Sequence, residues 1–163
     1  MCSSDLFRKG LVPPSAPDLQ ILRTAKDQQR VVKKNAGASL VDLGDGVLAV
    51  EFHSKMNAIG GDTIAMLHAG IKEATANGQA LVIGNDAPNF SAGANLMLVL
   101  LEAQEGNWDE LDMMVRQFQQ ATMALRYTPV PIVAAPAGLS LGGGTEIPLH
   151  CEDRKSTRLN SSH

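Results

Sequence analysis

The chain has 163 residues, 44% of them hydrophobic, which is enough for one domain with a buried core. Its 14 lysines and arginines against 17 aspartates and glutamates give a net charge of −3, so the sequence does not provide the basic surface that nucleic acids require. No apolar run reaches the roughly 18 residues of a membrane span, and no signal-peptide pattern opens the chain. We therefore expect a cytoplasmic protein without a membrane span and without a nucleic-acid partner.

Both ends of the sequence differ in character from the rest. Residues 1–6, "MCSSDL", and 153–163, "DRKSTRLNSSH", have no periodicity, and we interpret both as adapter-derived sequence rather than natural protein. The alternative for residues 153–163 is a natural disordered terminus. Cys2 and Cys151 form neither a disulfide framework nor a metal-ligand pattern, so no metal site is expected.

The first part of the chain predicts a linker followed by a hairpin. Residues 7–18 are rich in proline and read as a linker, and Leu19 to Gly37 is compatible with a polar helix. We assign residues 7–36 to a linker or to the tail of a preceding domain, and residues 37–152 to one partial domain. Residues 39–43 and 47–52 flank Gly44-Asp45-Gly46, which predicts two antiparallel strands joined by a tight turn.

Helices and strands alternate after the hairpin. A helix capped by Asp62 and ending at Asn77-Gly78 precedes a buried strand at 80–85, and residues 97–106 are apolar without a clear structure. A long helix starts at Asn107, with Glu110 placed as in a capping box, and ends before Pro129. A strand at 131–138 and a glycine-rich turn into a further helix follow. This order predicts an α/β fold with a parallel sheet and crossover helices. The inner face of the long helix is expected to consist of Leu111, Met114, Val115, Phe118, Ala121, Thr122 and Leu125.

Two loops rich in small residues follow the predicted parallel strands. One is "NFSAGAN", Asn89 to Asn95, and the other is "GLSLGGGTE", Gly138 to Glu146. Small residues at the start of a helix let another molecule approach backbone N–H groups that have no partner within the helix. Two such corners at one edge of a sheet would form a pocket for a negatively charged oxygen, with a carboxylate nearby.

The glycines and the glutamate are also compatible with purely structural roles. Gly142-Gly143-Gly144 could serve only to pack a strand closely against a helix. A phosphate-binding P-loop is excluded because its lysine is missing, and the G-x-G-x-x-G spacing of a dinucleotide site is absent. Glu146 could likewise be an ordinary first-turn glutamate that is favoured by the helix dipole.

The two loops together resemble the enoyl-CoA hydratase/isomerase family, also called crotonases. The residues that carry the resemblance are "SKMNAIGGD", "NFSAGANL" and "PVPIVAAPAGLSLGGGTEIPLHC", within residues 38 to 152. The resemblance implies a crotonase-like spiral of ββα units, truncated at its C-terminal side. The lead-in "KKNAGASLVDLGDGVLAVEF" is also similar to one subgroup, in which the hydratase domain follows a 3-hydroxyacyl-CoA dehydrogenase in a bacterial β-oxidation enzyme.

The resemblance assigns roles to individual residues. Backbone N–H groups of Ala94 and Gly143 would form the oxyanion hole for the thioester oxygen of an acyl-CoA, and Glu146 would be the catalytic acid–base. The domain itself would need no cofactor: coenzyme A is part of the substrate, and NAD would bind only in a fused dehydrogenase domain. The parent enzyme would be a homo-oligomer or part of a β-oxidation complex. The residues expected to line the substrate site are Lys55, Met56, Ala58, Ala92, Gly93, Asn95, Leu96 and Gly142.

The sequence departs from the family pattern at two places. Asn95 stands where many hydratases have aspartate, and the family's second glutamate lies further along the chain than Glu152. Glu152 cannot replace it, because six positions on it lies off the helical face of Glu146. We therefore expect this chain to be inactive as a hydratase, although its parent is active. The alternatives are a non-catalytic acyl-CoA binding or oligomerisation module of the same fold, and an unrelated nucleotide-binding domain.

Overall fold

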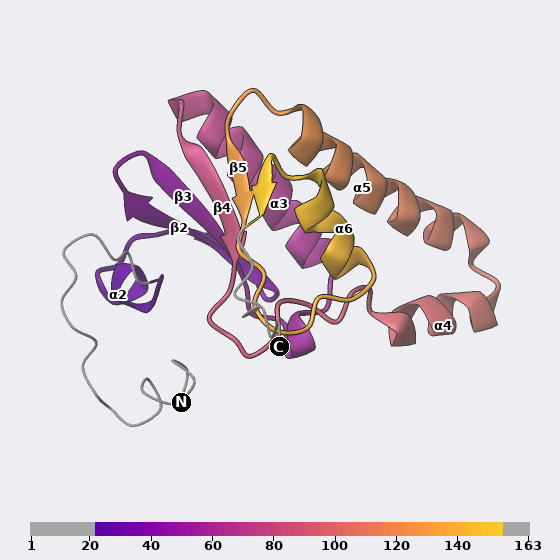
Figure 1. Ribbon diagram of the computed structural model, residues 1–163. Coiled ribbons are helices and arrows are strands. Elements are labelled where there is room, and N and C mark those ends of the chain that lie inside the picture. The colour runs from indigo at the N-terminus through magenta and orange to yellow at the C-terminus, as the bar shows by residue number, and fades with distance from the viewer. Residues whose placement is uncertain (1–21, 155–163) are drawn as a thin grey trace, which may run out of the picture.

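The structure, a computed structural model, describes residues 22–154 and contains one mixed sheet with helices on both of its faces (Figure 1). The six strands lie in the order β1-β2-β3-β4-β5-β6, antiparallel from β1 to β3 and parallel from β3 to β6. Apart from a short 3-10 turn at Lys55–Asn57, the elements are α2 (Leu22–Asp27), β1 (Val31–Lys34), β2 (Ala38–Gly44), β3 (Val47–Phe52), α3 (Gly61–Asn77), β4 (Ala80–Gly84), α4 (Leu96–Glu105), α5 (Trp108–Tyr127), β5 (Ile132–Ala134), α6 (Gly143–His150) and β6 (Asp153–Arg154).

The predicted hairpin is confirmed. Strands β2 and β3 pair antiparallel, with Leu40 opposite Val50. Asp45 and Gly46 both have positive φ angles, 51° and 75°, as a turn that follows the twist of the two strands requires. Alternate side chains of β3, among them Leu48 and Val50, are buried in the core beneath α3.

The predicted α/β order is also confirmed. Helix α3 connects β3 to the parallel strand β4, and α5 precedes β5. Helix α3 ends as expected, because Gly78 adopts the left-handed conformation, with φ of 64°, and its N–H donates to the carbonyl of Ala74. Its start was predicted wrongly: the helix begins at Gly61 after Gly60, so Asp62 lies inside the first turn, where its charge suits the helix dipole.

The prediction of one polar helix from Leu19 to Gly37 is wrong for the residues that the structure describes. Helix α2 ends at Asp27, and Val31–Lys34 form the edge strand β1, paired with β2. All four residues of β1 are exposed, so no buried face marks the strand in the sequence. Pairing with β2 decides its conformation. The predicted linker at 7–18 lies outside the described residues, and the domain boundaries at 36 and 152 remain predictions.

The long helix α5 has the expected start and end but not the expected cap. Asn107 precedes it without capping its N–H groups; its side-chain amide instead donates to the carboxylates of Glu102 and Glu105. The predicted inner face is buried only in the second half of the helix, at Ala121, Thr122 and Leu125. The first half packs against α4, which has no buried residue, and Figure 1 shows both projecting from the body of the molecule.

Candidate active site

Three loops meet beyond the carboxyl ends of β3, β4 and β5. The loop after β3 joins the loop after β4 through Ala92, whose N–H donates to the carbonyl of Met56 (3.2 Å), and Ile59, whose N–H donates to the carbonyl of Gly93 (2.8 Å). The loop after β5 joins the same corner through the N–H of Leu141, which donates to the carbonyl of Ser91 (3.0 Å). The two small-residue corners predicted from the sequence are therefore neighbours in space.

Ser91 holds this junction together. Its side chain is fully buried and its hydroxyl donates to the carbonyl of Asn57 at 2.7 Å, while the N–H of Gly93 donates to the same hydroxyl at 3.1 Å. A backbone bridge also pairs Ser91 with Ser140. One residue thus connects all three loops by hydrogen bonds, since its carbonyl accepts from Leu141.

Close packing explains several of the glycines. A Cβ atom on Gly93, whose φ is 84°, would lie 2.7 Å from the carbonyl oxygen of Leu141, and one on Gly144 would lie 2.7 Å from the Cβ of Ser91. A Cβ on Gly138 would overlap the carbonyl of Pro88. Within Gly142-Gly143-Gly144, close packing fits Gly144 and also Gly143, whose Cβ would lie 2.9 Å from the ring of Phe118. Gly142 differs, because no atom lies within 4 Å of the place of its Cβ.

The two amides expected to bind an oxygen belong to Ala94, which follows Gly93, and to Gly143, which begins α6. The place of a Cβ on Gly93, next to Ala94, is 3.5 Å from the backbone nitrogen of Gly143. None of the hydrogen bonds among residues 22–154 uses the N–H of Ala94 or of Gly143. Gly143 is the first residue of α6, and the N–H groups of a first helical turn have no acceptor within the helix. Both donors are therefore available to a ligand.

Glu146 lies in the first turn of α6, one turn after Gly143. Its N–H donates to the carbonyl of Gly142 (3.2 Å), and its carbonyl accepts from the Nδ1 of His150 (2.8 Å). The side chain is exposed, and none of the ion pairs or side-chain hydrogen bonds within the described part of the chain involves its carboxylate. The carboxylate is consequently free to meet a ligand from solvent.

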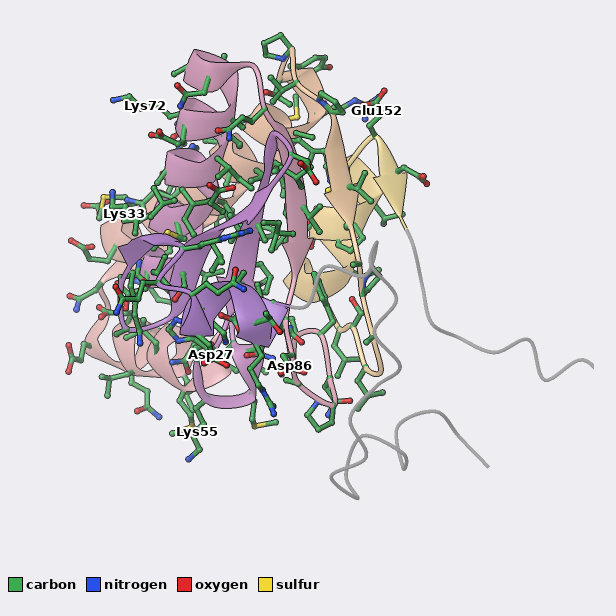
Figure 2. The ribbon with its side chains drawn as sticks, turned by 90° about the vertical axis from the view of Figure 1, so that its left-hand side faces the viewer. Asp27, Lys33, Lys55, Lys72, Asp86 and Glu152 are labelled. Carbon is green, nitrogen blue, oxygen red and sulfur yellow. The ribbon has the colours of Figure 1, made fainter. Side chains whose placement is uncertain are left out.

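The residues expected to line a substrate site divide into two groups. Met56 and Ala92 line a pocket of about 280 Å³ together with Ser54, Asn57, Ala87, Pro88, Asn89, Leu139 and Leu141. Ala58 and Gly93 lie in the same loops, and Gly142 precedes α6. The other six expected residues do not line this pocket, and neither do Ala94, Gly143 and Glu146; the six are Lys55, Ala58, Gly93, Asn95, Leu96 and Gly142. Figure 2 shows Lys55 extending away from the body of the molecule, and Leu96 is 74% exposed at the start of α4.

The backbone at Met56 and Asn57 is strained beside this pocket. Both residues have positive φ angles, 57° and 50°, which are costly for side chains other than glycine. Asn57 is held there by its amide, which donates to the carbonyl of Asn89 (3.0 Å), while Met56 is 72% exposed. The conformation presents the Met56 side chain to solvent at the rim of the pocket.

Asn95 has a structural role that its sequence position did not reveal. Its side-chain oxygen accepts from the N–H of Leu98 at 3.4 Å and so caps α4. Sequence reasoning also missed Ser91, Asn57 and Asn89, which hold the loops together. Their only signal in the sequence is their place: Asn89 and Ser91 belong to the small-residue loop Asn89 to Asn95, and Asn57 belongs to the segment "SKMNAIGGD".

Residues 22–154 contain neither a metal-binding group of side chains nor a helix that could span a membrane. No group of three histidine, cysteine, aspartate or glutamate side chains in this range is placed to hold a metal ion. Within the same range, no helix combines the length and the apolar character that crossing a bilayer requires.

Solved structures with a similar arrangement include enoyl-CoA hydratases. The enzyme from Bacillus halodurans superposes with a TM-score of 0.67 at 18% identity, over 73% of this chain and 49% of that one. The enzyme from Bacillus anthracis superposes with a TM-score of 0.64 at 22% identity, over 74% of this chain and 47% of that one. The protein therefore has part of a crotonase fold, as the sequence resemblance implied.

Two curated relatives match most of this chain. A Bacillus subtilis protein named as a probable 3-hydroxyacyl-CoA dehydrogenase is 51% identical over 125 residues, which are 77% of this chain and 16% of that protein. A Rickettsia prowazekii protein, provisionally named a fatty acid oxidation complex trifunctional enzyme, is 32% identical over 136 residues. The chain spans less than a fifth of the length of either protein. No family model matches the chain.

Proposed function

We propose that this chain is part of an enoyl-CoA hydratase/isomerase domain that acts on acyl-CoA thioesters in fatty-acid β-oxidation. The observation that supports the proposal is the junction at Ser91, where Gly93, the neighbour of Ala94, packs beside the start of α6, and no hydrogen bond among residues 22–154 uses the N–H of Ala94 or of Gly143. The relative named as a fatty acid oxidation complex trifunctional enzyme supports a place in fatty-acid oxidation. The relative named as a 3-hydroxyacyl-CoA dehydrogenase supports a parent polypeptide that also carries an NAD-dependent dehydrogenase. The hydratase part needs no cofactor of its own.

The two amides would stabilise negative charge on the thioester oxygen. That oxygen gains charge as the substrate becomes enolate-like, and fixed N–H donors lower the energy of this state more than that of the substrate. Rigid packing at Gly93 and Gly144 suits the task, because donors that are already in place need no reorganisation during the reaction. The loss of one such donor typically costs on the order of 3 kcal/mol in the transition state.

Glu146 would exchange a proton with the substrate or with the attacking water. Hydration moves two protons, one from the water and one to the α-carbon, and the family pattern uses two glutamates for them. Only Glu146 of that pair lies within residues 7–152 of this sequence. We therefore propose that this chain binds acyl-CoA but does not hydrate it. Measurable hydration of crotonyl-CoA by the purified chain would contradict this part of the proposal.

The oxyanion hole is tested by removing one N–H group. Gly143→Pro deletes the N–H at the first position of α6, where proline is tolerated. Gly143→Ala is the matched control, because it introduces the same contact of a Cβ with the ring of Phe118 but keeps the N–H. Calorimetry with crotonyl-CoA should show binding weakened roughly 5-fold in the proline variant relative to the alanine variant. Equal affinities would overturn the proposed role.

A non-catalytic acyl-CoA binding or oligomerisation module is the second candidate. The exposed and unbonded carboxylate of Glu146 favours it, because a module that only binds has no need to orient this group. Glu146→Gln in the full-length enzyme separates the two. Loss of hydration with retained crotonyl-CoA binding supports the enzyme, and an unchanged rate supports the module.

A further inference from the structure

Helix α2 packs on the face of the sheet opposite to α3, near the ends of β3 and β4. Ala25 of α2 is only 3% exposed, and Figure 1 shows α2 on one side of β2 and β3 with α3 on the other. Val50 of β3 faces α3, so the next residue, Glu51, faces α2. The first described helix thus lies beside the strands that lead into the candidate active site.

Lys26 of α2 pairs with the buried carboxylate of Glu51. The Nζ of Lys26 lies 2.7 Å from Oε1 of Glu51, and the glutamate side chain is only 6% exposed. A carboxylate removed from water needs a positive partner, and deleting that partner is strongly unfavourable. Glu51 is the next-to-last residue of β3, and the loop that contains Met56 begins after Phe52.

Arg23 makes the second connection, one turn earlier on the same face of α2. Its guanidinium lies 3.2 Å from the carboxylate of Asp86, which follows the end of β4. Figure 2 shows Asp86 on the same side of the molecule as Asp27, the last residue of α2. Both partners of this pair are exposed, so it contributes less than the Lys26 pair.

The two carboxylates stand at the bases of the two loops that form the site. Glu51 precedes the loop of Met56 and Ile59, and Asp86 precedes the loop of Ala92 to Asn95. These loops are bonded to each other through Ala92 and Met56 and through Ile59 and Gly93. A shift of either base relative to the other would therefore displace Ala94.

From this geometry we infer that α2 is a clamp for the acyl-CoA site, with Lys26 and Arg23 as positioning residues. The inference rests on the proposed function and extends it to a helix outside residues 37–152, where the domain was expected to lie. In addition to the pairing of Glu51 with Gly84 in the sheet, the helix holds the two loops relative to each other and so supports the position of the Ala94 amide.

The first test measures the preference of the full chain for a thioester. Lys26→Met keeps the aliphatic stem and removes the charge, and Lys33→Met on exposed β1 is the matched control. The ratio of the affinity for crotonyl-CoA to that for free coenzyme A should fall about 5-fold in Lys26→Met and remain unchanged in Lys33→Met. Lys26→Arg should restore the ratio. Equal ratios in folded Lys26→Met and in the unaltered chain would overturn the inference.

The second test needs no ligand. Hydrogen exchange of the hydrogen-bonded backbone amides of Ala92 and Gly93 should accelerate several-fold in Lys26→Met but not in Lys33→Met. Unchanged exchange at these amides overturns the clamp, whatever the binding results. If the unaltered chain shows no preference for the thioester, the proposed function fails, while the exchange experiment still decides whether α2 holds the loops. If Lys26→Met does not fold, Arg23→Gln takes its place, with a smaller effect expected in the same direction.

Discussion

Gly144 packs so closely on Ser91 that it cannot be replaced by a larger residue without a shift of the backbone. A Cβ atom on Gly144 would lie 2.7 Å from the Cβ of Ser91, 2.9 Å from its Oγ and 3.1 Å from its carbonyl oxygen. Because one of these atoms belongs to the backbone of a buried residue, a rotation of the Ser91 side chain cannot relieve the contact. The start of α6 is therefore fixed against the loop after β4.

Gly144→Ala should destabilise the protein by about 1–3 kcal/mol, the usual cost of adding a methyl group to a fully packed contact. Urea unfolding monitored by circular dichroism measures the change. Gly61→Ala provides the control, since the place of its Cβ is open and the residue begins α3. That variant should be as stable as the unaltered chain or slightly more stable. Equal losses in the two variants would show that the contact between Gly144 and Ser91 does not exist in solution.

Ser91→Ala should weaken both stability and ligand binding. It removes the acceptor of the Gly93 N–H and the donor to the carbonyl of Asn57, and it leaves buried polar groups without partners. The expected cost is about 1–3 kcal/mol of folding free energy. Thr24→Ala deletes a hydroxyl at an exposed position of α2 and should change the free energy of unfolding by less than about 0.5 kcal/mol. Urea titrations of both variants provide the comparison.

The parts of the fold that depend on local sequence could be predicted from it. The turn at Gly44-Asp45-Gly46 defines the hairpin by itself, and the end of α3 at Gly78 is equally local. The strand Val31–Lys34 could not be predicted, because it is exposed on the sheet edge and owes its conformation to pairing with β2. The predicted caps at Asp62 and Asn107 were wrong for a similar reason, because tertiary structure decides where a helix starts and which partner a side chain binds. Helix α3 begins one residue before Asp62, and the amide of Asn107 donates to Glu102.

The same distinction applies to the candidate site. The glycines and small residues of the two loops are visible in the sequence, and the structure brings their corners together. Ser91 could not be recognised, because its importance comes from three segments that meet only in the folded chain. The roles of Ala94, Gly143 and Glu146 remain predictions until their variants are measured.

The thiol of Cys151 should be almost unreactive in the folded protein. Burial raises its pKa from 9.0 to about 12, because the thiolate loses hydration. At pH 8 the thiolate fraction is then roughly 1000-fold smaller than in the unfolded chain. Labelling a Cys2→Ser variant with a disulfide reagent, with and without urea, measures the ratio. Rapid labelling of the native protein would show that the thiol of Cys151 is accessible to solvent.

The same pKa shift makes stability depend on pH in one direction. A group with a raised pKa in the folded state contributes its full stabilisation below its unfolded pKa and loses it as the pH rises through the folded value. The contribution of Cys151 should therefore decline between pH 9 and 12. Other groups also titrate in this range, so the comparison is with Cys151→Ala, whose stability should fall less steeply with pH. Parallel pH profiles of the two proteins would contradict the assignment.

Helix α4 should promote self-association of this chain. It has no buried residue, and Leu96, Met97, Leu100 and Leu101 are each at least half exposed to solvent. Apolar side chains gathered in this way usually mark a contact surface or cause aggregation. Replacing Leu100 and Leu101 by glutamate and lysine should lower the apparent molecular mass in light scattering without lowering stability. Leu125→Ala in the neighbouring helix α5 is the contrasting case: this residue is 2% exposed, so its loss should cost about 2–5 kcal/mol. A loss of stability in the double variant would show that α4 is buried against the rest of the chain.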